Sequence, residues 1–130
     1  MGNFSFYKSE YIETVTITDT AVNFAEHSHS DDFVATLLTS GLARLIVNQK
    51  HTDLSTGQIF MVAPYVPHSL YSESPVTLIS VCVKKQAVYG FEKSDFIRYI
   101  RSTLSALNFS ANVLNMLSDS LIGIYEAYHD

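Results

Sequence analysis

Short strands separated by turns dominate the chain between Tyr11 and Lys85 and restrict the folds that it can adopt. This region contains about eight short runs rich in β-branched and aromatic residues, with turn signals roughly every eight to twelve residues. Ser40-Gly41 separates two apolar runs as a hairpin-type break, and Pro64 and Pro67 bracket a loop. Regular spacing of this kind predicts an antiparallel sandwich or barrel.

The period of the apolar residues changes after this region. Ser94 is predicted to cap a first helix and Ser110 a second one. In the second helix, apolar residues recur at steps of three and four and form one stripe: Leu114, Leu117, Leu121, Ile124 and Tyr128. This stripe either packs on the protein's own sheet or forms a dimer interface, and the sequence favours neither alternative.

The length of 130 residues suits one folded domain, which divides into three zones. Residues 1–10 are aromatic but irregular and are expected to form an N-terminal arm, with Phe4, Phe6 and Tyr7 available to dock on the domain. Residues 11–90 form the predicted barrel, and residues 91–130 form a helical segment.

Charge and cysteine content exclude several classes of function. Eight Lys and Arg against thirteen Asp and Glu give a net charge of −5, so the basic face that duplex DNA requires is missing and no direct nucleic-acid contact is expected. The single cysteine, Cys82, excludes an internal disulfide and is interpreted as a packed core thiol. The chain has neither a signal-peptide pattern nor a long apolar window, which predicts a cytoplasmic protein without membrane association.

Three histidines have a spacing that is suggestive of a site. His27 and His29 lie two residues apart, so on a strand both side chains point to the same face, and His68 follows the proline-flanked loop. Converging imidazoles form a plausible site for zinc, iron, nickel or copper. Alternatively, the histidines are satisfied by hydrogen bonds or line a pocket for an organic ligand. Because there are only three candidate ligands, we expect no cofactor and keep a divalent transition metal as the alternative.

Two motifs around these histidines resemble those of the cupin superfamily. His27-Ser28-His29 followed by Gly41 resembles the first motif, and the segment from Gly57 to Pro67-His68 resembles the second. The chain departs from the pattern at the acidic position of the first motif, which is Val34. A metal-dependent cupin enzyme uses that carboxylate as a ligand, so its replacement favours a pocket for an organic ligand over an enzyme.

Within this superfamily, the chain is most similar to the N-terminal sensory domain of AraC-type transcriptional regulators. The strand from Ser28 to Val34 and the loop from Gly57 to Ser69 carry this resemblance. It implies a mainly β fold, a cupin-like double-stranded β-helix or jelly-roll barrel followed by two C-terminal helices. It also implies a non-enzymatic homodimer that binds a small organic effector and relays it to helix-turn-helix domains absent from this chain. DNA would be contacted only through those domains.

The residues expected to line the effector pocket combine the histidines with aromatic residues and one cation: His27, His29, Phe33, Arg44, Tyr65, His68 and Tyr71. Arg44 either pairs with a carboxylate or sugar hydroxyl of the ligand or points outward from its strand. The alternative function is a small stand-alone metal-dependent cupin enzyme, an oxygenase or isomerase, that uses the three histidines as metal ligands.

Overall fold

The computed structural model describes residues 3–7 and 9–129, of which residues 3–7 are described for the backbone alone. The strands of this part of the chain are β1 Asn3–Tyr7, β2 Ile12–Thr18, β3 Asn23–His27, β4 Asp32–Ser40, β5 Leu42–Val47, β6 Lys50–Ser55, β7 Ile59–Val62, β8 His68–Tyr71 and β9 Thr77–Lys84. The helices are α1 Lys85–Gly90, α2 Lys93–Ser105 and α3 Ala111–Ala127. No helix among these residues is long and apolar enough to cross a membrane.

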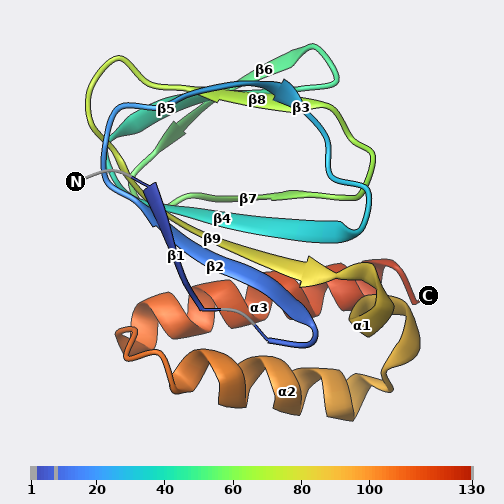
Figure 1. The fold of residues 1–130 in the computed structure, drawn as a ribbon. Coiled ribbons are helices and arrows are strands. Elements are labelled where there is room, and N and C mark those ends of the chain that lie inside the picture. The colour runs from blue at the N-terminus through green and yellow to red at the C-terminus, as the bar shows by residue number, and fades with distance from the viewer. Residues whose placement is uncertain (1–2, 8, 130) are drawn as a thin grey trace.

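The strands form two sheets that face each other (Figure 1). The larger sheet has five strands in the order β1-β2-β9-β4-β7, and the smaller has four in the order β3-β8-β5-β6. Gly41 joins β4 to β5 with a φ of 106°, a conformation that L side chains rarely adopt. A Cβ at this glycine would lie 2.8 Å from Cγ1 of Val76, so the turn also requires a residue without a side chain. The predicted mainly β fold with C-terminal helices is confirmed.

The two faces of strand β4 contact different layers of the fold. Because side chains alternate along a strand, Phe33, Ala35 and Leu37 face one side, while Val34 and Leu38 face the other. The first side is covered by the helices, as Figure 1 shows, and Phe33 belongs there to a core that includes Phe96, Ile100 and Leu104 of α2. The second side faces the smaller sheet, so Val34 lies on the inner wall of the barrel.

The apolar stripe of α3 packs inside the protomer. Leu117, Leu121 and Ile124 are 0%, 1% and 7% exposed and belong to the core between the helices and the larger sheet. Leu114 is partly buried against the same core, and Tyr128 is exposed. The prediction that this stripe forms the dimer interface is therefore wrong for its three central residues, since the protein's own sheet already covers them.

Several element boundaries differ from the expected ones. Ser110 caps α3 as predicted, and its Oγ accepts a hydrogen bond from the Val113 amide at 3.3 Å. The other helix begins at Lys93 after Glu92, so Ser94 lies inside its first turn and is not the cap. The short helix α1 was not predicted, because six residues are too few to show helical periodicity.

The N-terminal segment is more regular than expected. The backbone of β1 pairs antiparallel with β2, with Asn3 opposite Thr18 and Phe4 opposite Ile17. Residues 3–7 therefore form an edge strand of the larger sheet and not an irregular arm. The predicted docking of the Phe4, Phe6 and Tyr7 side chains lies outside the described residues.

Candidate histidine site in the barrel

The fold brings the three predicted histidines together at one end of the barrel. His27 ends β3, His68 begins β8, and the two are partners in the register of this antiparallel pair. His29 follows in the loop after β3. One ring nitrogen from each histidine lies within 4.8 Å of the others. The ring centroids are 4.3 Å apart for His27 and His68, 5.2 Å for His27 and His29, and 5.4 Å for His29 and His68. The predicted convergence of the imidazoles is confirmed.

Backbone carbonyls orient two of the rings. Nδ1 of His27 lies 2.7 Å from the Ala25 carbonyl oxygen, and Nδ1 of His68 lies 2.9 Å from that of Val66. Because a carbonyl oxygen only accepts hydrogen bonds, each Nδ1 carries the proton and donates. In the neutral ring, this leaves the lone pair on Nε2. Both histidines therefore present an acceptor or metal-ligating nitrogen.

The surroundings of the histidines favour their neutral forms. Burial lowers the pKa of His68, and His27 and His29 lower it further, although the hydrogen bond to Val66 opposes the shift. Burial likewise lowers the pKa of His29, with a further contribution from His27. Near neutral pH these imidazoles are therefore uncharged and keep their lone pairs.

This arrangement fits a divalent transition metal. Catalytic and ligand-binding metal sites commonly use three protein ligands and leave a further position open. Within the described part of the chain, no Cys, Asp or Glu joins the group of three. In His27 and His68, Nδ1 is bonded to a backbone carbonyl and Nε2 is available, which is the orientation that metal-binding histidines commonly have.

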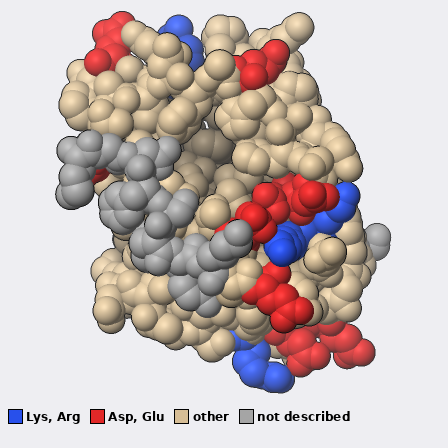
Figure 2. Space-filling model, viewed as in Figure 1, with Lys and Arg blue, Asp and Glu red and all other residues tan. Residues whose placement is uncertain are grey.

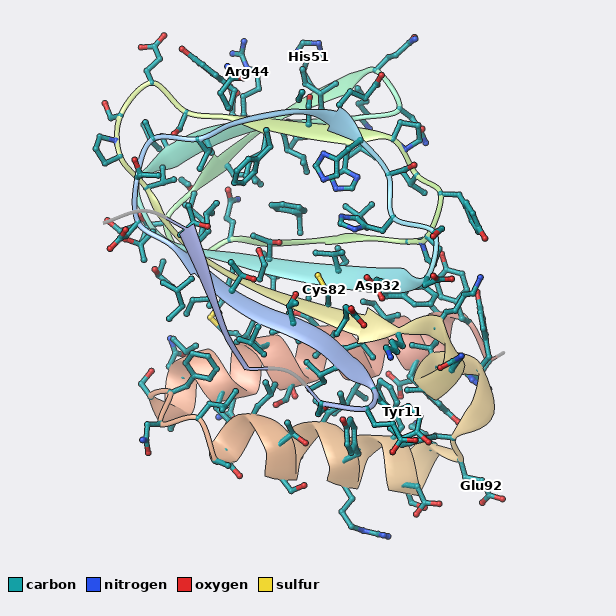
Figure 3. All side chains as sticks on the ribbon, viewed as in Figure 1. Tyr11, Asp32, Arg44, His51, Cys82 and Glu92 are labelled. Carbon is teal, nitrogen blue, oxygen red and sulfur yellow. The ribbon has the colours of Figure 1, made fainter. Side chains whose placement is uncertain are left out.

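The central part of the opposite wall of the barrel is made of small uncharged side chains. Val34 on β4 lies opposite Cys82 on β9, and Thr36 lies opposite Ser80, with 2.9 Å between the two hydroxyl oxygens. Figure 3 places Cys82 on the larger sheet, below the space between the two sheets. Burial raises the pKa of the Cys82 thiol to about 11, so this thiol stays protonated and is not a nucleophile. The wall therefore supplies no carboxylate at position 34.

A cavity of about 520 Å³ adjoins the histidines at the open end of the barrel. It is lined by Glu13, Ser28, His29, Ser30, Asp31, Asp32, Lys84, Lys85 and Gln86. His29 belongs to both the cavity and the histidine group, so the two are continuous. Figure 2 shows a recess between the two sheets, with acidic and basic side chains gathered along one edge. A cavity of this size holds a small organic molecule.

The other predicted pocket residues lie elsewhere. Phe33 faces the helices, where its ring contacts that of Tyr128 at 4.9 Å between centroids. Arg44 lies on the outer side of the smaller sheet, as Figure 3 shows, and forms a 3.1 Å ion pair with Asp53. Tyr71 is exposed and lies opposite Arg44 in the register of β5 and β8. These three residues do not line the barrel interior with the histidines.

Tyr65 lies in the loop before β8. Its side chain is 65% exposed, and the Lys85 ammonium lies 5.3 Å from the ring centroid. Its amide donates to the His29 carbonyl oxygen at 2.6 Å, so the backbone of Tyr65 holds the loop that carries His29. The residue therefore contributes to the site through its main chain, whereas the sequence suggested a contribution from its ring.

Two facing antiparallel sheets with three histidines at one open end define a cupin-type barrel. Residues 14–82 match the cupin domain family, which is more than half of the chain, and the protein belongs to this family. A search of curated proteins finds no significant match.

Solved structures share this fold at low sequence identity. A conserved protein of unknown function from Streptococcus pyogenes is 24% identical, with 63% of this chain and 72% of that one covered and a TM-score of 0.54. A cupin protein from Bacteroides fragilis is 18% identical, with 67% and 77% covered and a TM-score of 0.57. A predicted oxalate decarboxylase from Thermotoga maritima is 12% identical, with 63% and 78% covered and a TM-score of 0.58. The family contains both enzymes and proteins without catalytic activity, and these similarities establish the fold alone.

Proposed function

We propose that the barrel binds a small organic molecule at the three histidines, as the effector-binding domain of a cytoplasmic AraC-type transcriptional regulator. The observation that carries this proposal is the continuity of His27, His29 and His68 with a cavity of about 520 Å³. The resemblance of the motifs between Ser28 and Ser69 to the regulator family supports the regulatory role. DNA would then be contacted by helix-turn-helix domains that are separate from residues 1–130.

The inner wall supports binding without catalysis. Val34 stands where metal-dependent cupin enzymes have a carboxylate, and the protonated Cys82 thiol opposite it is a poor nucleophile. These two side chains can pack against a ligand, but neither is a base or a nucleophile. The homodimer that the resemblance implies would form through surfaces other than the buried residues of the α3 stripe.

Thermal-shift and calorimetric screening with sugars, amino acids and small organic acids tests the proposal. We expect at least one class to raise the unfolding temperature of the wild type and of His51→Ala, because His51 is exposed on the outer side of the smaller sheet (Figure 3). The same compound should stabilise neither His68→Ala nor His27→Ala. His27 is the more exposed of these two residues, so its substitution disturbs the packing of the fold less. If no compound of any class binds the wild type, ligand sensing is excluded.

A second candidate function is supported by the free Nε2 atoms of the histidine group. In this function His27, His29 and His68 hold a divalent transition metal, and the protein is a small cupin enzyme such as an oxygenase or isomerase. When bound, such a metal acts as a Lewis acid that orients and polarises an oxygen-bearing ligand. The chain's own residues orient the His27 and His68 imidazoles through the carbonyls of Ala25 and Val66, and burial lowers the pKa of His68.

Elemental analysis of freshly purified protein separates the two functions. Near-stoichiometric metal that is lost in His68→Ala and retained in His51→Ala supports the metal site. Protein that is purified without metal and does not take up added Fe(II), Ni(II) or Zn(II) excludes it.

A further inference from the structure

Asp32 carries a carboxylate to which the described residues supply neither a hydrogen bond nor an ion pair, and it lines the cavity that His29 also lines. The residue begins β4 and shares the inner face of this strand with Val34 and Thr36, because side chains alternate. It is half-buried and lines the same cavity as His29. Figure 3 shows Asp32 on the larger sheet at the end of the space between the two sheets. The Asp32 carboxylate and His29 therefore border the same cavity.

The cavity's own cations are already engaged by other acids. Nζ of Lys84 lies 3.6 Å from a carboxylate oxygen of Glu13, and Nζ of Lys85 lies 3.7 Å from one of Asp31. Among the described residues, the Asp32 carboxylate forms neither a hydrogen bond nor an ion pair. The cavity thus holds three carboxylates against two ammonium groups and keeps one negative charge at Asp32.

The surroundings make a charged Asp32 costly in the empty cavity. Burial raises the pKa of this carboxyl group, and the neighbouring Glu13 and Asp31 raise it further, although Lys84 opposes them. An incoming cation would reduce this cost, since Lys84 offsets it only in part. A neutral or anionic group at the same place would leave the cost in place or increase it.

At the other end of the same space, the histidines offer a different chemistry. His68 is only 6% exposed, and its Nδ1 is bonded to Val66, which leaves the lone pair on Nε2. A neutral imidazole accepts a hydrogen bond from a hydroxyl group through Nε2, whereas a carboxylate oxygen reaches it only through a bound metal. His29 lines both parts of the space, so one small molecule can contact the histidines and Asp32 together.

We infer that the cavity selects ligands with a cationic end, an amine or a guanidinium, which pairs with Asp32 while an oxygen-bearing end contacts the histidines. Asp32 is then a specificity-determining residue. This inference rests on the proposed binding function and names the class of molecule that the site accepts. The ligand class is that of amino acids and related amines, and not of sugars or simple acids.

Matched pairs of probes that differ only in the cationic group test the inference. γ-Aminobutyrate is compared with γ-hydroxybutyrate, and 4-amino-1-butanol with 1,4-butanediol, by amide NMR titration of the full chain. Asp32→Asn removes the charge with little change in shape, and Asp53→Asn removes one charge from the exposed pair with Arg44 on the outer side of the smaller sheet. We expect the cationic member to bind the wild type at least about tenfold more tightly, and Asp32→Asn to remove that preference, as a hydrogen bond to a charged partner predicts. Asp53→Asn should keep the preference.

The outcomes separate this inference from the proposed function. Equal binding of both members of each pair to the wild type overturns the selectivity but leaves ligand binding at the histidines intact. An equal loss of preference in Asp32→Asn and Asp53→Asn also overturns it, because the effect is then one of net charge. If no probe binds and neutral sugars and acids fail as well, both the inference and the proposed function are wrong.

Discussion

Truncation of Leu117 tests whether the α3 stripe holds the protomer together. Leu117 is 0% exposed and lies in the core with Ile100 and Leu104 of α2 and the helix-facing side of the larger sheet. Leu117→Ala removes three carbon atoms from a site that solvent does not reach. Comparable core truncations cost about 2–5 kcal/mol, and the packing on two sides leads us to expect about 3 kcal/mol. For a domain of this size, this loss lowers the unfolding temperature by roughly 10 °C.

Chemical denaturation followed by circular dichroism measures this cost. The control is Leu42→Ala, since Leu42 is 71% exposed and its truncation should change the free energy of unfolding by less than about 0.5 kcal/mol. Sedimentation of both variants reports the oligomeric state independently. An unchanged unfolding midpoint for Leu117→Ala, together with dissociation of a wild-type dimer, would refute the internal packing and restore the stripe as a subunit interface.

Three further predictions concern pH, the thiol and a turn. The pKa values of His29 and His68 are lowered in the folded state. The unfolded chain therefore binds protons that the folded chain does not. This makes the free energy of unfolding largest above about pH 6.5 and smaller as the pH drops through that value. Urea midpoints between pH 7.5 and pH 5.5 should therefore decrease, and less so in His68→Gln; an equal decrease in both proteins contradicts the assignment. Cys82 is partly exposed, but its pKa of about 11 leaves little thiolate at pH 8, so it should react with a thiol reagent more slowly than a free cysteine; labelling of the folded protein at the rate of a free cysteine contradicts the raised pKa. Gly41→Ala should destabilise the fold by more than about 1 kcal/mol, and Gly57→Ala by less. Both glycines have positive φ, but only at Gly41 would a Cβ collide with Val76. Equal costs of the two substitutions in thermal denaturation would show that the collision is unimportant.

The sequence predicted the histidine site because its geometry depends on short-range rules. The spacing of His27 and His29 fixes their common face, and the proline-flanked loop leads the chain into the strand that His68 begins. Pairing of β3 with β8 then makes His27 and His68 neighbours. Strand period and turn spacing were likewise sufficient for the mainly β fold.

The positions of the other predicted pocket residues depend on which layer of the fold each face of their strand contacts. Phe33 and Val34 are adjacent, yet one packs under the helices and the other lines the barrel, and no apolar pattern in a strand buried on both faces distinguishes them. Side chains also alternate along β5, and Arg44 lies on its outward face. Asp32 begins β4 two residues before Val34 and therefore shares its inner face, which was not predicted from the sequence. The stripe of α3 shows only that one face is apolar, and the structure shows that the protein's own sheet covers it.

Imidazole NMR of the five histidines during a ligand titration tests the central claim, that the three-histidine group is the binding site, most directly. The wild type is titrated with the compound that stabilises it best in the thermal-shift screen. We predict that the ring signals of His27, His29 and His68 move together on saturation, while those of His51 and His129 stay unchanged. Saturable binding that moves resonances of Arg44 and Tyr71 on the outer side of the smaller sheet, and leaves the three imidazoles unchanged, would contradict it.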